Sequence, residues 1–161
     1  MPRSQLASQS KRSSRTDERA ARRYYVVKAE VQNPRAKAFV FAHMKTMYGG
    51  KQVAKGDTIF VFASETEGGE GLVARGVVTK VEAVAAQAGV ARQTPRVSIW
   101  VKRTASAEQP LGRAQLRAWR NLSDGSGQAE LDFKLYRQAT NKIIAVEEGA
   151  ARVLLGRFSG S

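Results

Sequence analysis

Two stretches of the sequence decide the fold: KGDTIFVFAS at residues 55–64 and GLVARGVVTKVEAV at residues 71–84. In the first stretch, a Lys-Gly-Asp turn leads into a run of β-branched and aromatic residues, which is typical of a strand. The second stretch predicts one long strand with a bulge or bend at Gly76, because glycine inside a strand weakens it and lets it bend. A long strand that bends in this way is expected where a sheet curls into a barrel.

The segments before these strands predict one more strand and one helix. Residues 24–31 (YYVVKAEV) are aromatic and β-branched and predict the first strand, which an Asn33-Pro34 turn follows. From about Ala36 to Tyr48, apolar residues recur at helical spacing. We therefore expect a helix there, which Gly49-Gly50 would end as a left-handed cap.

The segments after these strands complete the predicted fold. Residues 96–104 alternate polar or basic with apolar side chains and predict a half-buried strand. Helices are expected over about 113–120 and 147–155, whereas residues 131–135 fit either a strand or a helical turn. Five or six strands with three peripheral helices indicate an α+β domain, a small curled β-sheet or pseudo-barrel.

Composition bounds the function. The chain has 161 residues, enough for one domain, and its net charge of +13 favours a polyanionic partner, with nucleic acid as the first candidate. Anionic membranes and acidic proteins would respond to the same charge. The absence of cysteine and the single histidine, His43, exclude disulfides, thiolate catalysis and multi-histidine metal centres. We expect no cofactor, although a carboxylate-only magnesium site stays open.

The chain divides at about residue 22. Residues 1–22 are rich in Arg, Ser and Gln, and we expect a disordered basic tail that acts either as a solubilising segment or as an arm for nucleic acid. Residues 23–161 are expected to form the domain. The apolar runs are too short for a membrane span, and no signal-peptide core follows Met1, so we expect a cytoplasmic protein without a membrane partner.

The two opening stretches resemble the PUA-like superfamily, and within it the EVE domains and their YTH, ASCH and SRA relatives. These domains have a Lys-Gly-Asp turn, a strand that ends near an aromatic residue and a serine, and then a long strand with a central glycine. The Tyr24-Tyr25 strand and the Asn33-Pro34 turn are similar to the start of an EVE domain. Pro110-Leu111 with its short helix, and a C-terminal helix after Val146, also match in order.

The resemblance implies a pseudo-barrel that binds nucleic acid, RNA or DNA, often by taking a modified base into an aromatic pocket. On this basis Tyr25, Asn33 and Phe62 are candidate binding residues, with Ser64 and Lys28 as polar partners. EVE domains usually have Trp at the position of Tyr25 and Tyr at the position of Phe62. A Phe keeps the stacking face but lacks the hydroxyl group.

The residues themselves add further candidates. If Val97, Ile99 and Val101 face the core, Trp100 points outward, beside Lys102 and Arg103, where an aromatic ring among cations suits stacking on bases. Trp100 would otherwise cover core under the helix predicted over 113–120. Arg75 lies inside an apolar strand and needs a ligand or a structural partner, Glu30 or Glu82. Lys134, Arg137 and Lys142, with Tyr136 between them, form a second basic and aromatic stretch that would contact phosphates or simply face solvent.

Three functions compete. The first is a nucleic-acid-binding domain that reads a base and holds the backbone with basic residues. The second is a hydrolase that acts on modified nucleosides or nucleotides, which would need an acid or base in the cleft; no carboxylate pair has diagnostic spacing, so a non-enzyme is expected. The third is a basic structural or ribosome-associated protein without a pocket. Charge, outward aromatics and resemblance favour the first.

Overall fold

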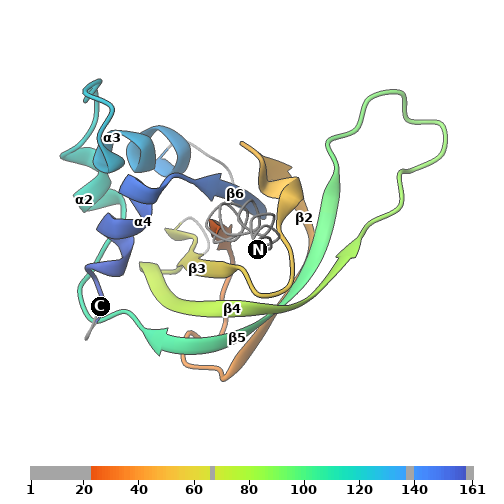
Figure 1. Ribbon diagram of the computed structural model, residues 1–161, viewed down its shortest axis with the longest axis horizontal. Coiled ribbons are helices and arrows are strands. Elements are labelled where there is room, and N and C mark those ends of the chain that lie inside the picture. Colours follow the sequence, from red (N-terminus) through yellow and green to blue (C-terminus); the bar gives the residue numbers. More distant parts are fainter. Residues whose placement is uncertain (1–22, 66–67, 137–139, 159–161) are drawn as a thin grey trace, which may run out of the picture.

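The computed structural model describes residues 23–65, 68–136 and 140–158, which form a closed six-stranded barrel and a layer of helices (Figure 1). The strands follow the order β1-β3-β4-β5-β2-β6 around the barrel, and β6 pairs with β1 to close it. The predicted α+β pseudo-barrel is therefore confirmed, whereas the predicted tail of residues 1–22 lies outside the described residues. The strands are β1 (Tyr24–Ala29), β2 (Ala38–Met47), β3 (Thr58–Ala63), β4 (Gly71–Ala83), β5 (Arg96–Ser106) and β6 (Lys142–Val146).

The two stretches that decided the fold form neighbouring antiparallel strands, β3 and β4. The Lys-Gly-Asp turn before β3 is held by the Asp57 carboxylate, which accepts a hydrogen bond from the Ala54 amide at 2.9 Å, while Gly56 adopts φ 95°. In β4 the pairing with β5 shifts between Arg75 and Gly76, so the predicted irregularity at Gly76 is confirmed. This bend lets a 13-residue strand curve around the barrel.

The helix predicted over residues 36–48 is wrong, because this segment is strand β2. Phe39, Phe41 and Met44 are all buried in the barrel core. The step from Phe41 to Met44 covers three residues on β2, whereas the paired step from Ile99 to Val97 covers two on β5. One extra residue on one strand is a β-bulge, and it moves the apolar side chains off strict alternation into a spacing that imitates a helix.

Strand β6 was not predicted, although it closes the barrel between β1 and β2. It has only five residues, and the polar stretch before it gives no alternating pattern. The segment at 131–135, which fitted two elements, is helical. The helices are α2 (Arg113–Arg117), α3 (Gly127–Leu131), which continues into a π-helical turn (Asp132–Tyr136), and α4 (Glu148–Leu155).

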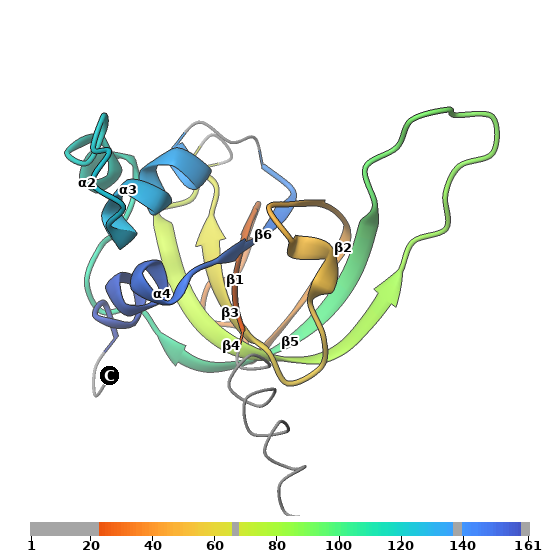
Figure 2. The same cartoon turned by 45° about the horizontal axis from the view of Figure 1, so that its top comes forward.

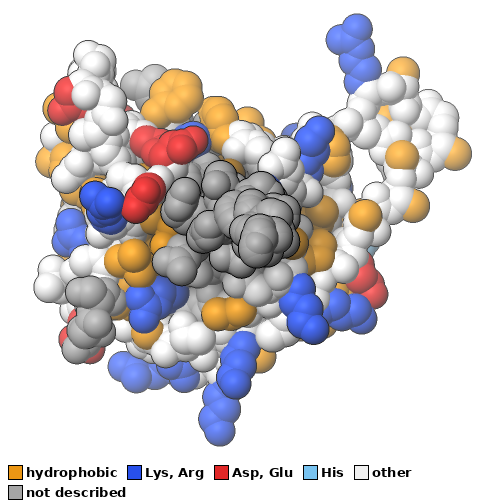
Figure 3. Space-filling view, in the orientation of Figure 1, with side chains coloured by type: hydrophobic (Ala, Val, Ile, Leu, Met, Phe, Trp, Pro, Cys, Tyr) orange, Lys and Arg blue, Asp and Glu red, His pale blue; other side chains and the backbone are white. Residues whose placement is uncertain are grey.

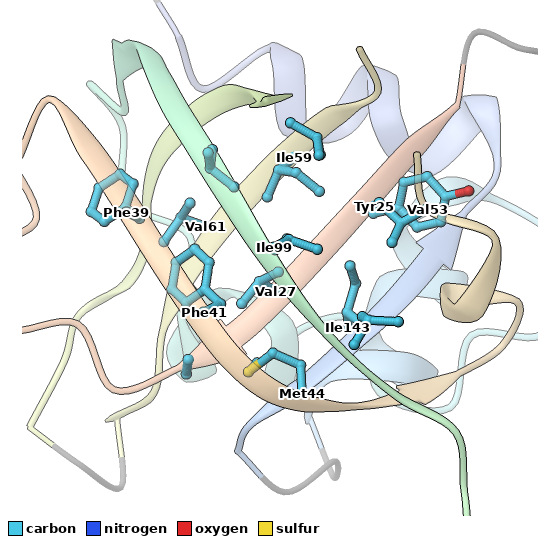
Figure 4. Close-up of a cluster of buried hydrophobic side chains, with 14 of the residues drawn as sticks. Tyr25, Val27, Phe39, Phe41, Met44, Val53, Ile59, Val61, Ile99 and Ile143 are labelled. Atoms are coloured by element: carbon cyan, nitrogen blue, oxygen red, sulfur yellow. The ribbon is translucent and has the colours of Figure 1, made fainter. Parts of the chain in front are cut away.

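Two apolar clusters hold the structure together. Inside the barrel, side chains such as Val27, Phe41, Ile99 and Ile143 converge from several strands (Figure 4). Outside the barrel, Val26 of β1, Phe60 and Phe62 of β3 and Ile144 of β6 pack against apolar side chains of the helical layer, including Leu116, Leu131 and Leu154. The helices therefore cover β1, β3 and β6, whereas β4 and β5 extend away from them into a long hairpin (Figures 1 and 2).

The close approach of β4 and β5 at Gly76 gives a test of the barrel. A Cβ at this position would lie 2.4 Å from the backbone oxygen of Lys102, so Gly76→Ala must push the two strands apart. We expect it to lower the free energy of unfolding by about 1–3 kcal/mol, measured by urea unfolding. The matched control is Gly149→Ala in α4, where the nearest atom would be 3.7 Å away. The control should be neutral or stabilise by up to about 1 kcal/mol, as alanine does in helices, and equal stabilities for the two variants would contradict this packing.

Candidate nucleic-acid interface

Charge is distributed unevenly over the fold. Strands β2, β4 and β5 together carry six basic residues and one acidic residue, Glu82, whereas the described residues between 113 and 155 carry six basic and five acidic ones. The strands away from the helices are therefore electropositive, and the helical layer is nearly neutral. Lys and Arg side chains gather along the lower edge of the surface, over β4 and β5, in the space-filling view (Figure 3).

Trp100 lies at the centre of this electropositive surface. Its partners on the neighbouring strands are Val40 of β2 and Lys80 of β4, so these side chains emerge on the same side of the sheet. Trp100 is half-buried, and Val40, 58% exposed, makes an apolar patch beside it. Lys102 follows two residues later on β5, is exposed, and is paired with Ala38. We call these four residues, Val40, Lys80, Trp100 and Lys102, the β5 face.

The geometry of the β5 face suits a base and its phosphate. The Lys80 ammonium lies 4.7 Å from the centroid of the Trp100 ring and 3.1 Å from a Glu82 carboxylate oxygen. Both partners of this ion pair are more than half exposed, so the pair contributes little to stability and a phosphate can replace the carboxylate. An indole ring with an exposed cation above it can then exchange that cation for a stacked base.

A hollow lies beside the β5 face, between the β1–β2 loop and β2. Its volume is about 300 Å³, and the described residues that line it include Glu30, Asn33, Phe39, Val40 and Phe41. Phe39 and Phe41 stack with their ring centroids 5.7 Å apart. We call this cavity the loop hollow. These rings are buried beneath the hollow, whose accessible lining combines the exposed Val40 side chain with amide and carboxylate groups, which are the groups that read the hydrogen-bonding edge of a base.

Arg103 holds the loop that forms the hollow. Its guanidinium group donates hydrogen bonds to the backbone oxygens of Ala36 at 2.8 Å and Arg35 at 3.2 Å, and to the Ser106 hydroxyl at 3.2 Å. Asn33 accepts a hydrogen bond from the Arg35 amide in the same loop. Of the residues singled out from the sequence, Trp100 and Lys102 therefore share the β5 face, and Arg103 holds the loop that contains Asn33.

Three other predicted residues are buried. Tyr25 is 1% exposed and belongs to the barrel core, and Phe62 is 1% exposed and packs under the helical layer. Neither ring presents a face to a base in this structure. Ser64 is also buried, and its backbone amide donates to Ala29 at the end of β1. Burial raises the pKa of the Tyr25 hydroxyl.

Lys28 and Arg75 lie away from the β5 face. The Lys28 ammonium is half-buried and donates to the Leu135 carbonyl at 2.9 Å; burial, and then the charge of Arg113, lower its pKa. The Arg75 guanidinium lies 5.1 Å from the centroid of the Phe158 ring, at the edge of the helical layer. Both side chains therefore contact the layer that packs on the barrel.

Sequence reasoning missed Val40 and Lys80 as site residues. The segment with Val40, Phe39 and Phe41 was assigned to a helix, although the alternation of Phe39 and Phe41 is a signal for a strand. Lys80 meets Trp100 only because the β4–β5 register shifts between Val78 and Lys80, and no local pattern reveals that shift.

Two classes of site are not found. Across residues 23–65, 68–136 and 140–158, no helix has both the length and the apolar character that a membrane crossing requires. The same residues contain no group of three or more His, Cys, Asp or Glu side chains placed to hold a metal ion.

No protein-family model and no curated protein matches the sequence. Solved structures do match the fold. The human THYN1 protein in complex with DNA that contains 5-methylcytosine has a TM-score of 0.57 and 12% identity, over 83% of this chain and 96% of that one. The DUF55 domain of human thymocyte nuclear protein 1 gives 0.57 and 11% over 83% and 96%, and a hypothetical protein from Leishmania major gives 0.55 and 16% over 84% and 94%. This chain therefore has the PUA-like fold, of the kind found in the DUF55 or EVE domain that its motifs resemble.

Proposed function

We propose that this protein is a nucleic-acid-binding domain that stacks a base on Trp100 and holds the adjoining phosphates with Lys80 and Lys102. The observation that carries the proposal is the position of Trp100, half-buried, outward-facing and covered by a lysine, in strands with six cations and one acid. Stacking on an aromatic side chain tolerates any base, and cations around it bind the backbone of any sequence. The structural neighbour that binds DNA with 5-methylcytosine supports this class of ligand at the level of the fold.

Base selectivity comes from the loop hollow. We propose that an extruded base, including a modified one, enters between the β1–β2 loop and β2, next to Val40, which is paired with Trp100. Val40, which is exposed, would contact the face of the base, and Asn33 and Glu30 would read its edge. The described residues that line the loop hollow include one carboxylate, that of Glu30, and the function that we propose is binding without a chemical step.

Removing the Trp100 ring tests the stacking platform. Trp100→Ala should weaken binding of a short single-stranded oligonucleotide by about 5- to 150-fold, because stacking contributes about 1–3 kcal/mol per base. Fluorescence anisotropy of a labelled oligonucleotide measures the change. The matched control is Phe133→Ala, which removes a 64% exposed ring from the helical layer and should leave the affinity unchanged. Equal effects of both variants would remove Trp100 from the interface.

The lysines of the β5 face should act through salt dependence. Lys80→Ala/Lys102→Ala should reduce the slope of log affinity against log salt by about 1.4–1.8, since each phosphate contact contributes about 0.7–0.9. The control, Lys55→Ala/Arg152→Ala, removes two cations outside β2, β4 and β5 and should change the slope by less than half as much. If both double variants reduce the salt slope equally, the slope depends only on total charge, and the protein would be a basic scaffold without a defined site.

The loop hollow is tested by a substitution that preserves charge. Arg103→Lys keeps the positive charge but loses the planar group that binds two backbone oxygens of the loop and the Ser106 hydroxyl. In competition binding between oligonucleotides with cytosine and with 5-methylcytosine, we expect the parent to prefer one, and Arg103→Lys to lose most of that preference. The overall affinity should fall less than threefold, and an unchanged preference would place base recognition elsewhere.

A further inference from the structure

Four basic residues form a row on the outside of the barrel, one on each of the neighbouring strands β5, β2, β6 and β1. Arg96 of β5 is paired with Lys45 of β2, Lys45 with Lys142 of β6, and Lys142 with Lys28 of β1. Each of four consecutive strands therefore contributes one basic residue at the same level. We call Arg96, Lys45, Lys142 and Lys28 the cation row.

All four side chains start from the outer surface of the barrel. The neighbours Val97, Met44, Ile143 and Val27 are buried in the barrel core, and successive residues of a strand point to opposite faces. Arg96 is exposed, and the other three are half-buried. The row thus begins in solvent beside the β5 face and ends under the helical layer, where Lys28 reaches the Leu135 carbonyl.

This arrangement works against stability. Like charges that are directly opposite on neighbouring strands repel each other. Burial, and then the charge of Lys45, lower the pKa of Lys142. Burial and the charges of Arg113 and Lys142 lower the pKa of Lys28, and the charge of Glu65 partly opposes them. Repulsion of this kind, built into the barrel, indicates an anionic ligand that relieves it.

A cavity of about 510 Å³ opens above the exposed end of the row. The connection between β4 and β5, residues 84–95, projects from the barrel as an arm and forms one wall (Figures 1 and 2). Lys45, Arg92 and Arg96 line this arm cavity, and none of the described residues that line it is Asp or Glu. The cavity is therefore electropositive on both sides.

Hydrogen bonds fix both walls of the arm cavity. The Thr46 amide and hydroxyl both donate to the Pro95 carbonyl, at 3.1 and 2.7 Å, and tie the base of the arm to β2. Within the arm, the Gln93 side chain accepts from the Gln87 amide and donates to the carbonyls of Gln87 and Val90. The cavity is thus preformed, so a ligand need not supply the ordering free energy.

We propose that the arm cavity and the cation row form a track for the sugar-phosphate backbone of a polynucleotide whose base stacks on the β5 face. Three strand spacings of about 4.8 Å give the row a length of about 14 Å. This length accommodates a few successive phosphates of one strand. Arg96, two residues along the same face of β5 from Ser98 and four from Trp100, joins the track to the stacking platform. The identity of the ligand rests on the proposed function, whereas the track itself rests on the row and the cavity.

The test uses a probe without bases, a short oligonucleotide made only of abasic deoxyribose phosphates, and the full chain. Lys45→Met/Lys142→Met keeps the aliphatic stems and removes two charges from the row. It should weaken binding of the abasic probe at least tenfold and reduce its salt slope by about 1.4–1.8. Trp100→Ala should change the affinity for this probe by less than twofold. The control Lys55→Met/Arg152→Met should reduce the salt slope much less.

A second readout is the thermal midpoint of the protein without ligand. Because the double variant removes repulsion within the row, its midpoint should equal or exceed that of the parent. Arg92→Ala changes an exposed residue of the arm, away from the barrel core, and should also weaken binding of the abasic probe. Two results would overturn the track. One is that Lys45→Met/Lys142→Met and Arg92→Ala both bind the abasic probe as tightly as the parent; the other is that the control Lys55→Met/Arg152→Met loses as much affinity as the variants. The proposed function would survive either result if the parent binds ordinary oligonucleotides and Trp100→Ala weakens that binding. If the parent binds no polynucleotide, the proposed function itself fails.

Discussion

The β-bulge in β2 is the constraint on which the β5 face and the cation row both depend. Before the bulge, Phe39 and Phe41 face the barrel core and Val40 faces out; after it, Met44 faces the core and Lys45 faces out. His43, with φ 56°, completes the bulge, its amide donating to the Ser98 hydroxyl and its carbonyl accepting from Arg96. If the same residues alternated strictly, with no bulge, Lys45 would share the face of Phe41 and point into the apolar core, where an unpaired charge is costly. The bulge therefore keeps Val40 and Lys45 on the outside of the same strand.

The outer faces of the strands differ because the helices pack on only one side of the barrel. β1, β3 and β6 need apolar side chains on both faces, because the barrel core lies on one side and the helical layer on the other. β2, β4 and β5 carry no such layer over most of their length, so their outer faces are open to Trp100, Val40 and a surplus of cations. A barrel with one covered and one open side can hold an outward-facing ring in place among exposed lysines. The stacking platform and phosphate track that we propose would then need no moving part.

The sequence was informative wherever a signal was local. Runs such as TIFVFA and YYVVKA identified β3 and β1, and the alternation around Trp100 correctly placed this ring on the outside of β5. β2 was mistaken for a helix because the bulge broke its period, and β6 is too short for a period to show. Tyr25 and Phe62 became candidates because resemblance cannot tell whether an aromatic side chain lines a pocket or fills a core. Lys80 beside Trp100, and the cation row, depend on registers between strands distant in the chain, which no single segment encodes.

The most direct test of the central claim uses the fluorescence of Trp100 itself. The chain has two tryptophans, and Trp119 packs against the apolar cluster under the helical layer. A Trp119→Phe chain therefore reports on Trp100 alone. Titration with a single-stranded oligonucleotide should quench this emission in a saturable manner, with the same midpoint as anisotropy gives for the labelled oligonucleotide, because a stacked base contacts the indole ring directly. Binding by anisotropy without any change in Trp100 emission would show that the nucleic acid does not stack on the β5 face.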